Sequence, residues 1–420
     1  MAENERSFRA PRGTFDVLPP QSWARAAIAR LAMDTFALSG YAPIETPIFE
    51  HTEVFERGVG EASEVVGKQM YTFTDRGGRS LTLRPEGTAP VMRAVLEHNL
   101  HRGSLPIKVS YAGPMFRQER PQKGRYRQFF QVGIEAIGSD DARVDAEVIE
   151  VGTLFYSAAG VDTRLMLNSI GHVDPSCRQG YIKVLVEFLK AHESSLAPED
   201  RDRVGTNPLR TFDSKEKKTI EVMREAPVIT DHLCAACTEH FDQVKGLLDD
   251  VGVAYELQPS LVRGLDYYTR TACEWVAEGL GSQDAVGGGG RYDGLSESLG
   301  GPPLPGMGIA PGVDRIVLAR RGAEASAGRV RVYVVALGEA AQREAFKLVS
   351  HLRRAGIGAD LDLMGRSMKG QMKDASRSGA RWAVILGDEE LVANTVTLKD
   401  LESSEQETIA FGDLEARLSS

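Results

Sequence analysis

The chain has 420 residues, enough for two or three domains with complete hydrophobic cores. Its formal net charge of -9 argues against a protein that binds nucleic acid through bulk charge, although a local basic patch is still compatible with specific binding. Four cysteines are too few for a disulfide scaffold, no apolar run is long enough to cross a membrane, and the N-terminal stretch lacks the apolar core of a signal peptide. We therefore expect a soluble protein of the reducing cytoplasm, without a membrane partner.

The first hundred residues predict two helices, an edge strand and a hairpin. Apolar residues recur at helical spacing over 22–38. Pro43 and Pro47 confine the stretch that follows to an edge or interface strand. Residues 70–84 alternate on either side of a double-glycine turn, which is typical of a hairpin, and a second helix is predicted over 89–100.

Glu86 and Thr88 stand directly before this second helix. As an N-terminal cap, Thr88 would satisfy free backbone amides and Glu86 would favour the helix dipole. The alternative is that these polar groups face a ligand. The local pattern leaves both interpretations open.

Residues 111–138 are the central stretch of the chain, because two strand-like runs flank a centre rich in basic residues, proline and glycine. This pattern predicts a hairpin with a basic tip. In the second run, the alternation places Gln131 and Glu135 on one face and apolar side chains on the other. In the first run, Arg117 shares a face with Glu119, and strand pairing would bring Arg117 near Gln131. We thus expect a cation, an anion and an amide in one concavity.

The tip of this hairpin holds four basic residues: Arg120, Lys123, Arg125 and Arg127. Charges on one side of a hairpin often form only a solvated face. Four like charges at one tip, however, repel one another unless an anion is bound. The crowding therefore favours a phosphate ligand.

A helix is predicted over 141–157, and residues 172–258 then change to charged helical segments broken by prolines, as in an inserted subdomain. This region contains His232, Cys234, Cys237 and His240. A CxxC motif with nearby histidines is compatible with zinc, but a second, distant ligand pair is missing. We therefore expect an ordinary helical segment here and no metal site formed by a side-chain cluster.

Sheet patterning returns over residues 261–276. A regular strand would point Tyr267 and Tyr268 to opposite faces, unless Gly264 introduces a bulge that turns both tyrosines toward one cavity. The two arrangements differ in whether one or both rings reach a ligand.

The glycine run over 287–290 lacks the lysine and hydroxyl of a phosphate-binding P-loop. Glycines here more simply let the backbone pass close to a flat ligand or to another strand. Residues 306–318 then place small residues before a helix that carries Arg315.

Residues 321–329 are predicted to be a linker, followed by a small α/β domain with right-handed crossovers over 330–420. The expected order is strand 330–336, helix 339–355, strand 357–363, helix 367–378, strand 381–386, then a final strand and helix.

A basic stripe follows the helix predicted over 367–378, with Asp374 as the only nearby acid. Its members are Arg366, Lys369, Lys373 and Arg377. Spacing of about four residues places three of them along one side of the helix, as contact with a phosphate backbone requires. A solvated lysine face is the alternative.

Together these motifs resemble class II aminoacyl-tRNA synthetases and, within that class, the histidyl-tRNA synthetase family, over nearly the whole chain. The segment around Pro47 is similar to motif 1, the central hairpin to motif 2, and residues 306–318 to motif 3. The stretches LVRGLDYYTRT (261–271) and GGGGRYDGL (287–295) resemble the two signatures of the histidine family.

The resemblance implies an α+β protein with a class II antiparallel-sheet catalytic domain over 1–171 and 259–320. It further implies a helical insertion over 172–258 and, after the linker, an anticodon-binding α/β domain over 330–420. A homodimer joined through motif 1 is implied as well. The implied partners are tRNA(His), L-histidine, ATP and Mg²⁺.

The resemblance also assigns roles to side chains. Arg117 and Arg263 would be catalytic, beside the reacting phosphate. Histidine would be bound by Glu86, Gly87, Thr88, Arg117, Gln131, Glu135, Arg263, Tyr267 and Tyr268. ATP would be bound by Arg117, Glu119, Arg125 and Arg315, with Mg²⁺ beside Glu119. tRNA would contact Arg366, Lys369, Lys373 and Arg377.

Motif 3 departs from the pattern of the family, which usually ends in glycine, an apolar residue, glutamate and arginine, without a proline just before. Here the sequence is Ala-Pro-Gly-Val-Asp-Arg over 310–315. Asp314 has a shorter side chain than the usual glutamate, and Pro311 is an additional proline. Both can change the geometry of the part of the site that is expected to bind the nucleotide.

Two other functions are compatible with parts of this sequence. A regulatory subunit of ATP phosphoribosyltransferase shares the catalytic fold, but such paralogues typically lack the anticodon-binding domain and the signatures, both of which this chain retains. A general RNA-binding protein with a nucleotide pocket would explain the basic stripe but not the paired imidazole-binding groups. Histidine-dependent exchange of pyrophosphate into ATP discriminates among the three.

Overall fold

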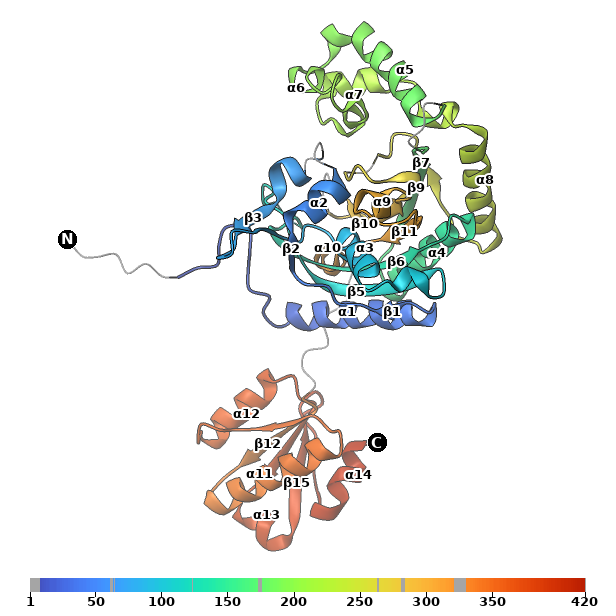
Figure 1. The fold of residues 1–420 in the computed structure, drawn as a ribbon. Helices are drawn as coiled ribbons and strands as arrows, with labels where there is room; N and C mark the ends of the chain where they lie inside the picture. The colour runs from blue at the N-terminus through green and yellow to red at the C-terminus, as the bar shows by residue number, and fades with distance from the viewer. Residues whose placement is uncertain are drawn as a thin grey trace, which may run out of the picture. The chain divides into compact units, whose positions relative to one another are not determined.

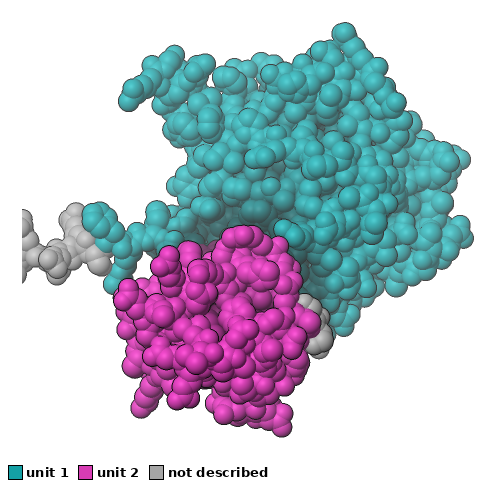
Figure 2. All heavy atoms as spheres, turned by 90° about the horizontal axis from the view of Figure 1, so that it is seen from below, with its two compact units in different colours: residues 1–16, 25–322 teal, residues 17–24, 323–420 magenta. Residues whose placement is uncertain are grey.

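The computed structural model describes residues 8–60, 63, 65–122, 124–172, 176–262, 264–280, 284–320 and 330–419. They fall into two compact units, one within residues 1–16 and 25–322 and the other within 17–24 and 323–420 (Figure 2). Arg263, Lys123 and the predicted linker 321–329 lie outside the described residues. In the part of the chain that is described, no helix combines the length and the apolar character needed to cross a membrane.

The first unit is built on an eight-stranded sheet in which the long hairpin β5–β6 supplies the second and third strands from one edge (Figure 1). In order across the sheet, the strands are β1 (Ala42–Pro43), β5 (Ile107–Phe116), β6 (Gln128–Ile137), β11 (Gly306–Ile309), β10 (Ala285–Arg291), β9 (Thr269–Val276), β7 (Arg164–Ser169) and β8 (Glu256–Leu257). All pairs from β5 to β7 are antiparallel, and β1 and β8 add parallel strands at the two edges. This mixed α+β architecture confirms the predicted fold class.

The glycine-rich strand β10 lies between β9 and β11, where side chains have no room. A Cβ atom on Gly289 would lie 1.9 Å from the carbonyl oxygen of Gly308, and one on Gly287 would lie 2.2 Å from the hydroxyl of Tyr156. The glycines therefore let this strand pass close to its neighbours, as predicted.

The three helices predicted in the first half of the chain are present as α1 (Gln21–Leu38), α3 (Thr88–Glu97) and α4 (Ala142–Ala158). The structure adds α2 (Thr52–Val59), which was not predicted, a π-helical turn over Val65–Gln69 and a 3₁₀ turn over Leu100–Arg102. Ile28 and Phe36 of α1 share a buried core with Phe155 of α4 and Ile134 of β6. This core therefore holds the apolar face of the central hairpin, so that its polar face is left for the other side of the sheet.

A smaller three-stranded sheet contains the second predicted hairpin. Its order is β2 (Phe49–His51), β4 (Ser80–Leu83) and β3 (Tyr71–Thr74), all antiparallel. The tight turn between β3 and β4 contains Gly78 with φ +79°, a conformation that favours glycine. β4 leads directly into the loop before α3.

The described residues between β7 and β8 form mainly helices, as predicted (Figure 1). They form α5 (Arg178–Ala191), α6 (Pro198–Arg201), α7 (Lys217–Met223) and α8 (Ala235–Asp250), with 3₁₀ turns over Glu193–Ser195, Pro208–Asp213 and Ile229–His232. Phe241, Val244 and Leu248 of α8 belong to the same core as α4. Leu185 of α5 belongs to a second core, which includes Tyr268. The helical region is thus packed onto the sheet at both of its ends.

The second unit is an α/β layer around a five-stranded sheet in the order β13 (Ala359–Leu361), β12 (Val332–Ala336), β14 (Trp382–Leu386), β15 (Thr395–Asp400) and β16 (Gln406–Ala410). Its helices are α11 (Glu339–Arg354), α12 (Met368–Arg377), α13 (Asp388–Ala393) and α14 (Leu414–Ser419), with a 3₁₀ turn over Phe411–Asp413. The first three strands are parallel, while β15 and β16 are antiparallel. One strand and one short helix more than predicted complete the unit.

Candidate active site

An open pocket lies on the polar face of the central hairpin. Its cavity volume is about 220 Å³. Ten predicted site residues line it: Glu86, Gly87, Thr88, Arg117, Glu119, Arg125, Gln131, Tyr267, Tyr268 and Arg315. They come from the loop before α3, the hairpin β5–β6, the loop before β9, and α10 (Val313–Ala319). Segments far apart in the sequence therefore converge on one site.

Glu86 caps helix α3 from within the pocket wall. Its carboxylate accepts hydrogen bonds from the backbone amides of Thr88 (2.6 Å) and Ala89 (3.0 Å). Burial raises the pKa of Glu86, and these amides offset part of the shift. The capping interpretation is confirmed for Glu86 but is wrong for Thr88, because the Thr88 hydroxyl donates to Glu135 at 2.7 Å.

Glu135, a predicted site residue, is not part of the pocket lining: 1% of its surface is exposed, and it contacts Thr88 of the lining. Its carboxylate accepts hydrogen bonds from the hydroxyls of Thr88, Tyr111 (3.4 Å) and Tyr292 (2.6 Å). The opposite residue on β11 is Gly308, where a Cβ atom would lie 1.8 Å from a Glu135 carboxylate oxygen. Burial raises the pKa of Glu135 to about 8. This is a carboxyl group enclosed by hydroxyls, with space kept free for it by a glycine.

The raised pKa of Glu135 predicts how the stability of the first unit depends on pH. From about pH 5 to pH 7 the unfolded chain loses this proton whereas the folded chain retains it, so folding loses stability as pH rises. Glu135→Gln removes the titration. We expect its free energy of unfolding, relative to the parent, to rise by up to about 1.4 kcal/mol per pH unit over this range.

Urea unfolding at pH 5, 6 and 7 measures this difference. Glu53→Gln is the matched control, because the Glu53 carboxylate is exposed on α2 and its difference from the parent should stay flat. A flat difference for Glu135→Gln as well would show that Glu135 ionises normally.

Tyr267 and Tyr268 both face the pocket, with ring centroids 4.7 Å apart. The prediction that sheet structure begins at residue 261 is wrong, because β9 begins only at Thr269. The preceding segment is held instead by a hydrogen bond from the Asp266 amide to the Val59 carbonyl (3.2 Å). A turn rather than a strand bulge thus brings the two rings together.

Gln131 supplies an unused acceptor. Its amide nitrogen donates weakly to the Ala310 carbonyl at 3.5 Å. Its side-chain oxygen is buried and has no hydrogen-bond partner among the described residues. Since a buried acceptor without a partner costs about 1 to 3 kcal/mol, this oxygen suits a ligand that carries a donor.

Arg117 and Arg125 form the cationic part of the pocket. Arg117 donates to the Pro85 carbonyl (2.9 Å) and lies 3.9 Å from Glu119, which also accepts from Arg125 at 3.3 Å. Burial lowers the pKa of Arg117, but a guanidinium stays charged at neutral pH. These two cations lie around the Glu119 carboxylate, and Arg315 is a third cation of the pocket lining.

The register of the hairpin differs from the predicted one. Gln131 pairs with Gly113, whereas the backbone amide of Arg117 bonds to the Arg127 carbonyl beyond the end of β5. The predicted proximity of Arg117 and Gln131 through strand pairing is therefore wrong, although both residues line the pocket.

The basic tip is also less uniform than predicted. Arg127 donates to the carbonyls of Glu119 (3.3 Å) and Arg12 (3.2 Å), and neither Arg120 nor Arg127 lines the pocket. Of the tip residues that the structure describes, Arg125 alone reaches it.

The unusual motif 3 sequence joins α10 to the hairpin. Asp314 accepts a hydrogen bond from the Phe130 amide at 2.8 Å, and the Pro311 carbonyl accepts from the Val132 amide at 3.1 Å. Arg315 donates to the carbonyls of Gly124 and Ala285 and faces the pocket. The short Asp314 thus makes a structural contact and leaves Arg315 in the predicted place.

Sequence reasoning missed Tyr111 and Tyr292, whose hydroxyls reach Glu135. Both stand in stretches with a recognisable signal, the central hairpin and the GGGGRYDGL signature. The direction in which these two tyrosine side chains point depends on tertiary packing, which the local sequence does not reveal. Glu274, on β9, is a further carboxylate of the pocket wall that the sequence did not single out.

Comparison with known proteins identifies the family. Residues 13–316 match the family model described as histidyl-tRNA synthetase, and residues 331–420 match the anticodon binding domain. The chain belongs to the histidyl-tRNA synthetase family. It is 50% identical over 412 residues to a histidine–tRNA ligase of Nocardia farcinica (97% of both chains), and 49% identical over 419 residues to that of Streptomyces coelicolor (99% of this chain, 98% of the relative).

The solved structure of apo S. aureus histidyl-tRNA synthetase is similar to this fold with a TM-score of 0.80 and 38% identity, and covers 99% of this chain and 100% of its own. As a member of the histidyl-tRNA synthetase family, the chain is an enzyme that attaches histidine to tRNA(His), with ATP as substrate. A regulatory subunit of ATP phosphoribosyltransferase is not favoured, because both family matches together span nearly the whole chain.

Proposed function

We propose that the pocket on the β5–β6 hairpin carries out both steps of tRNA(His) charging. Histidine and ATP first form histidyl-adenylate and pyrophosphate, and the adenylate then transfers histidine to tRNA with release of AMP. The observation that supports this assignment best is that the Arg117 guanidinium and the Gln131 amide line one pocket, and that Thr88 of the same lining hydrogen-bonds to the buried Glu135 carboxylate.

In the first step, the histidine carboxylate attacks the α-phosphorus of ATP and expels pyrophosphate. Negative charge spreads over the phosphoryl oxygens, so fixed cations lower the barrier by charge stabilisation and positioning. Arg117 takes this role because its guanidinium is anchored by the Pro85 carbonyl before substrate binds. We assign the second cation to Arg263, on the ground of its place in the LVRGLDYYTRT signature.

The α-amino group of histidine is assigned to the wall formed by Glu86, Gly87, Thr88 and Gln131. The unpartnered oxygen of Gln131 supports this, since an ammonium group supplies the missing donor. The carboxylate of Glu86 adds the negative charge that an ammonium group prefers, and Tyr267 donates to it at 3.3 Å.

The imidazole ring is assigned to the deeper side, between Glu135 and Tyr268. Imidazole has two different edges, one donor and one acceptor in its neutral form. Glu135 and the Tyr268 hydroxyl can satisfy both. A side chain without two polar edges would leave one buried group unpaired at about 1 to 3 kcal/mol, which is the basis of discrimination.

ATP is assigned to the side of the pocket formed by Glu119, Arg125 and Arg315. Mg²⁺ fits here, because it is usually held by one or two carboxylates together with phosphate oxygens, and Glu119 and Glu274 both line this wall. When bound, the ion would neutralise phosphate charge. Arg125 and Arg315 orient the phosphates from the protein side.

In the second step, the terminal ribose hydroxyl of tRNA takes the histidyl group. None of the described side chains of the pocket is placed as an obvious general base for this hydroxyl. We assign that role to the phosphate of the adenylate itself.

We propose that residues 1–171 and 259–320 form the catalytic domain, 172–258 an insertion, 321–329 a linker and 330–420 the anticodon-binding domain of a cytoplasmic homodimer. Phe49 and Phe73 support the dimer: both are about half exposed and lie together on the small sheet next to motif 1. Sedimentation equilibrium of the full chain measures its mass, and a monomer would contradict the dimer.

The basic stripe of the second unit is assigned to tRNA, with a correction. Arg366 pairs with Asp362 at 2.8 Å and with Asp374, so Asp374 is not the only nearby acid and Arg366 is partly neutralised. Lys369, Lys373 and Arg377 are exposed. These three carry the proposed contact with the phosphate backbone.

Replacing Lys369 and Lys373 together by alanine is expected to raise the KM for tRNA about tenfold and to leave histidine-dependent pyrophosphate exchange unchanged, because phosphate contacts contribute to tRNA affinity and not to adenylate formation. The matched control removes two exposed charges from α11 in the same unit, Lys347→Ala with Arg354→Ala. An equal loss in aminoacylation and in pyrophosphate exchange would contradict the assignment of the stripe to tRNA binding. An equal effect of the control variant on the KM for tRNA would contradict it as well.

The proposed function is tested by aminoacylation with purified tRNA(His) and each of the common amino acids. We expect histidyl-tRNA to form and other aminoacyl-tRNAs to form at least about 10²-fold more slowly. A folded sample that charges tRNA with another amino acid, or with none, would overturn the assignment.

A further inference from the structure

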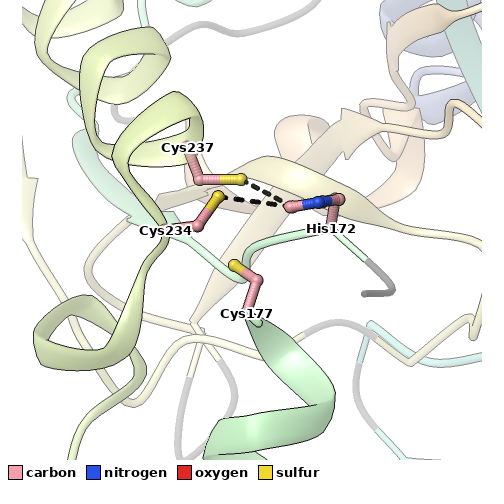
Figure 3. A group of neighbouring side chains, drawn as sticks. All are labelled: His172, Cys177, Cys234 and Cys237. Carbon is pink, nitrogen blue, oxygen red and sulfur yellow. Dashed lines mark hydrogen bonds between the residues drawn. The ribbon is translucent and has the colours of Figure 1, made fainter. Parts of the chain in front are cut away.

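Three cysteines and a histidine converge outside the active site (Figure 3). The ligand atoms of His172, Cys177, Cys234 and Cys237 all lie within 4.8 Å of one another. The His172 Nδ1 atom is 3.0 Å from the Cys237 sulfur and 3.8 Å from the Cys234 sulfur. The second ligand pair that the sequence analysis found missing is therefore present, supplied by His172 and Cys177.

The two histidines that the sequence placed beside the CxxC motif have other partners. His240 hydrogen-bonds to Asp145 at 2.7 Å, and the His232 ring packs on Tyr181 with centroids 5.5 Å apart. They are therefore not members of the cluster.

The cluster is built from three separate segments. His172 follows β7, Cys177 immediately precedes α5, and Cys234 immediately precedes α8, with Cys237 in its first turn. The side chains of Cys177 and Cys237 are each about 1% exposed. The N-terminus of a helix stabilises a thiolate. The N-termini of α5 and α8 meet at this cluster and therefore suit a group of anionic sulfur ligands.

Thiols packed this closely are unfavourable as ions unless a cation joins them. A bound divalent cation would stabilise all the thiolates together.

We propose that His172, Cys177, Cys234 and Cys237 bind a structural zinc ion. Three sulfurs and one imidazole nitrogen are a closed zinc ligand set, and Cys-x-x-Cys is a usual spacing for two of them. Zinc bond lengths imply separations between ligand atoms of roughly 3.5 to 3.8 Å. Separations near the 4.8 Å limit must therefore shorten by about 1 Å, and the 3.0 Å between His172 and Cys237 must lengthen by about 0.5 Å. With four protein ligands the ion has no open position, which assigns it a structural and not a catalytic role.

The site would tie the helical insertion to the histidine-binding loop. Arg178, next to Cys177, is buried and donates to the Tyr268 carbonyl at 2.6 Å. Gly171, next to His172, accepts from the Arg270 amide at 2.8 Å, and a Cβ atom on Gly171 would lie 2.6 Å from the Cys177 sulfur. The ion would thus hold α5 and α8 against the segment that positions Tyr268.

Metal analysis of the full chain, purified without chelator, is the first test. We expect about one zinc per chain in the parent and in the Cys273→Ala control, whose cysteine lies apart in β9, and less than about a tenth in Cys177→Ser and Cys234→Ser. Cobalt exchanged into the parent should give the intense visible and near-ultraviolet bands of a tetrahedral thiolate site, a measurement that needs no variant.

A parent with no zinc after growth in zinc-supplemented medium would overturn the proposal. So would thiol counting in denaturant that shows two thiols lost to a Cys234–Cys237 disulfide, or a cobalt spectrum unchanged in the serine variants. If the ion supports Tyr268, metal-free protein that remains folded should show a KM for histidine raised about tenfold with the KM for ATP unchanged. Unchanged KM values for histidine and ATP would show that the ion does not support the loop that carries Tyr268.

Discussion

Replacing Arg117 by alanine is expected to lower histidine-dependent pyrophosphate exchange by about 10³-fold or more, since one donor aimed at developing charge is worth about 10² to 10³ and Arg117 is assigned to both the phosphate and the substrate carboxylate. The guanidinium is held by the Pro85 carbonyl and lies beside Glu119, so its position is set before substrate binds. Arg117→Lys keeps the charge but loses the planar fork, and we expect it to recover only part of the rate.

Arg120→Ala is the matched control. Arg120 is an exposed arginine of the same hairpin that does not line the pocket, and its loss should leave exchange within about twofold of the parent. The melting temperature of both variants separates catalysis from folding. An Arg117→Ala variant that folds and keeps normal exchange would contradict the role of this residue.

Replacing Glu135 by alanine is expected to raise the KM for histidine by about 10²-fold and to weaken discrimination, while the KM for ATP stays near that of the parent. The reason is that this carboxylate is held by hydroxyls of three residues and faces no cation of the ATP side. Without it, one edge of the imidazole ring is buried without a partner, and the hydroxyls of Thr88 and Tyr292 lose their acceptor.

The control for Glu135→Ala is Glu53→Ala, which removes an exposed carboxylate from α2 in the same unit. A parallel rise in the KM values for histidine and ATP would point to general damage of the pocket. An unchanged KM for histidine would place the imidazole ring elsewhere.

The sequence could predict elements whose periodicity and turn residues agree. Alternation of polar and apolar residues predicts the central hairpin, and helical spacing of apolar residues predicts the helix over 142–158. The run of glycines predicts a strand that passes close to its neighbours. Ten residues of the pocket lining were also predicted, through the resemblance of several motifs to one family.

Register and loop geometry could not be predicted in the same way. The hairpin pairs Gly113 with Gln131, because ten residues of each strand pair in sequence and Arg117 falls beyond the ladder. Likewise, β9 begins at Thr269 because the preceding residues bond to a distant loop through Asp266 and Val59. Both outcomes depend on contacts that no local pattern contains.

The cysteine cluster shows the same limit more strongly. His172 and Cys237 are 65 positions apart, and neither His172 nor Cys177 stands in a metal-binding motif of its own. Only the fold brings them to the CxxC motif. Asp362, which pairs with Arg366 of the basic stripe, was missed for a similar reason. It precedes the helix, so the helical spacing of the stripe does not include it.

The most direct test of the account is exchange of labelled pyrophosphate into ATP by the purified full chain with Mg²⁺, without tRNA, and with each amino acid in turn. We predict exchange that depends on histidine and falls by about 10³-fold in Arg117→Ala. Exchange driven equally by another amino acid, or no exchange in a folded sample supplied with Mg²⁺, would contradict the assignment of the β5–β6 pocket to histidine activation.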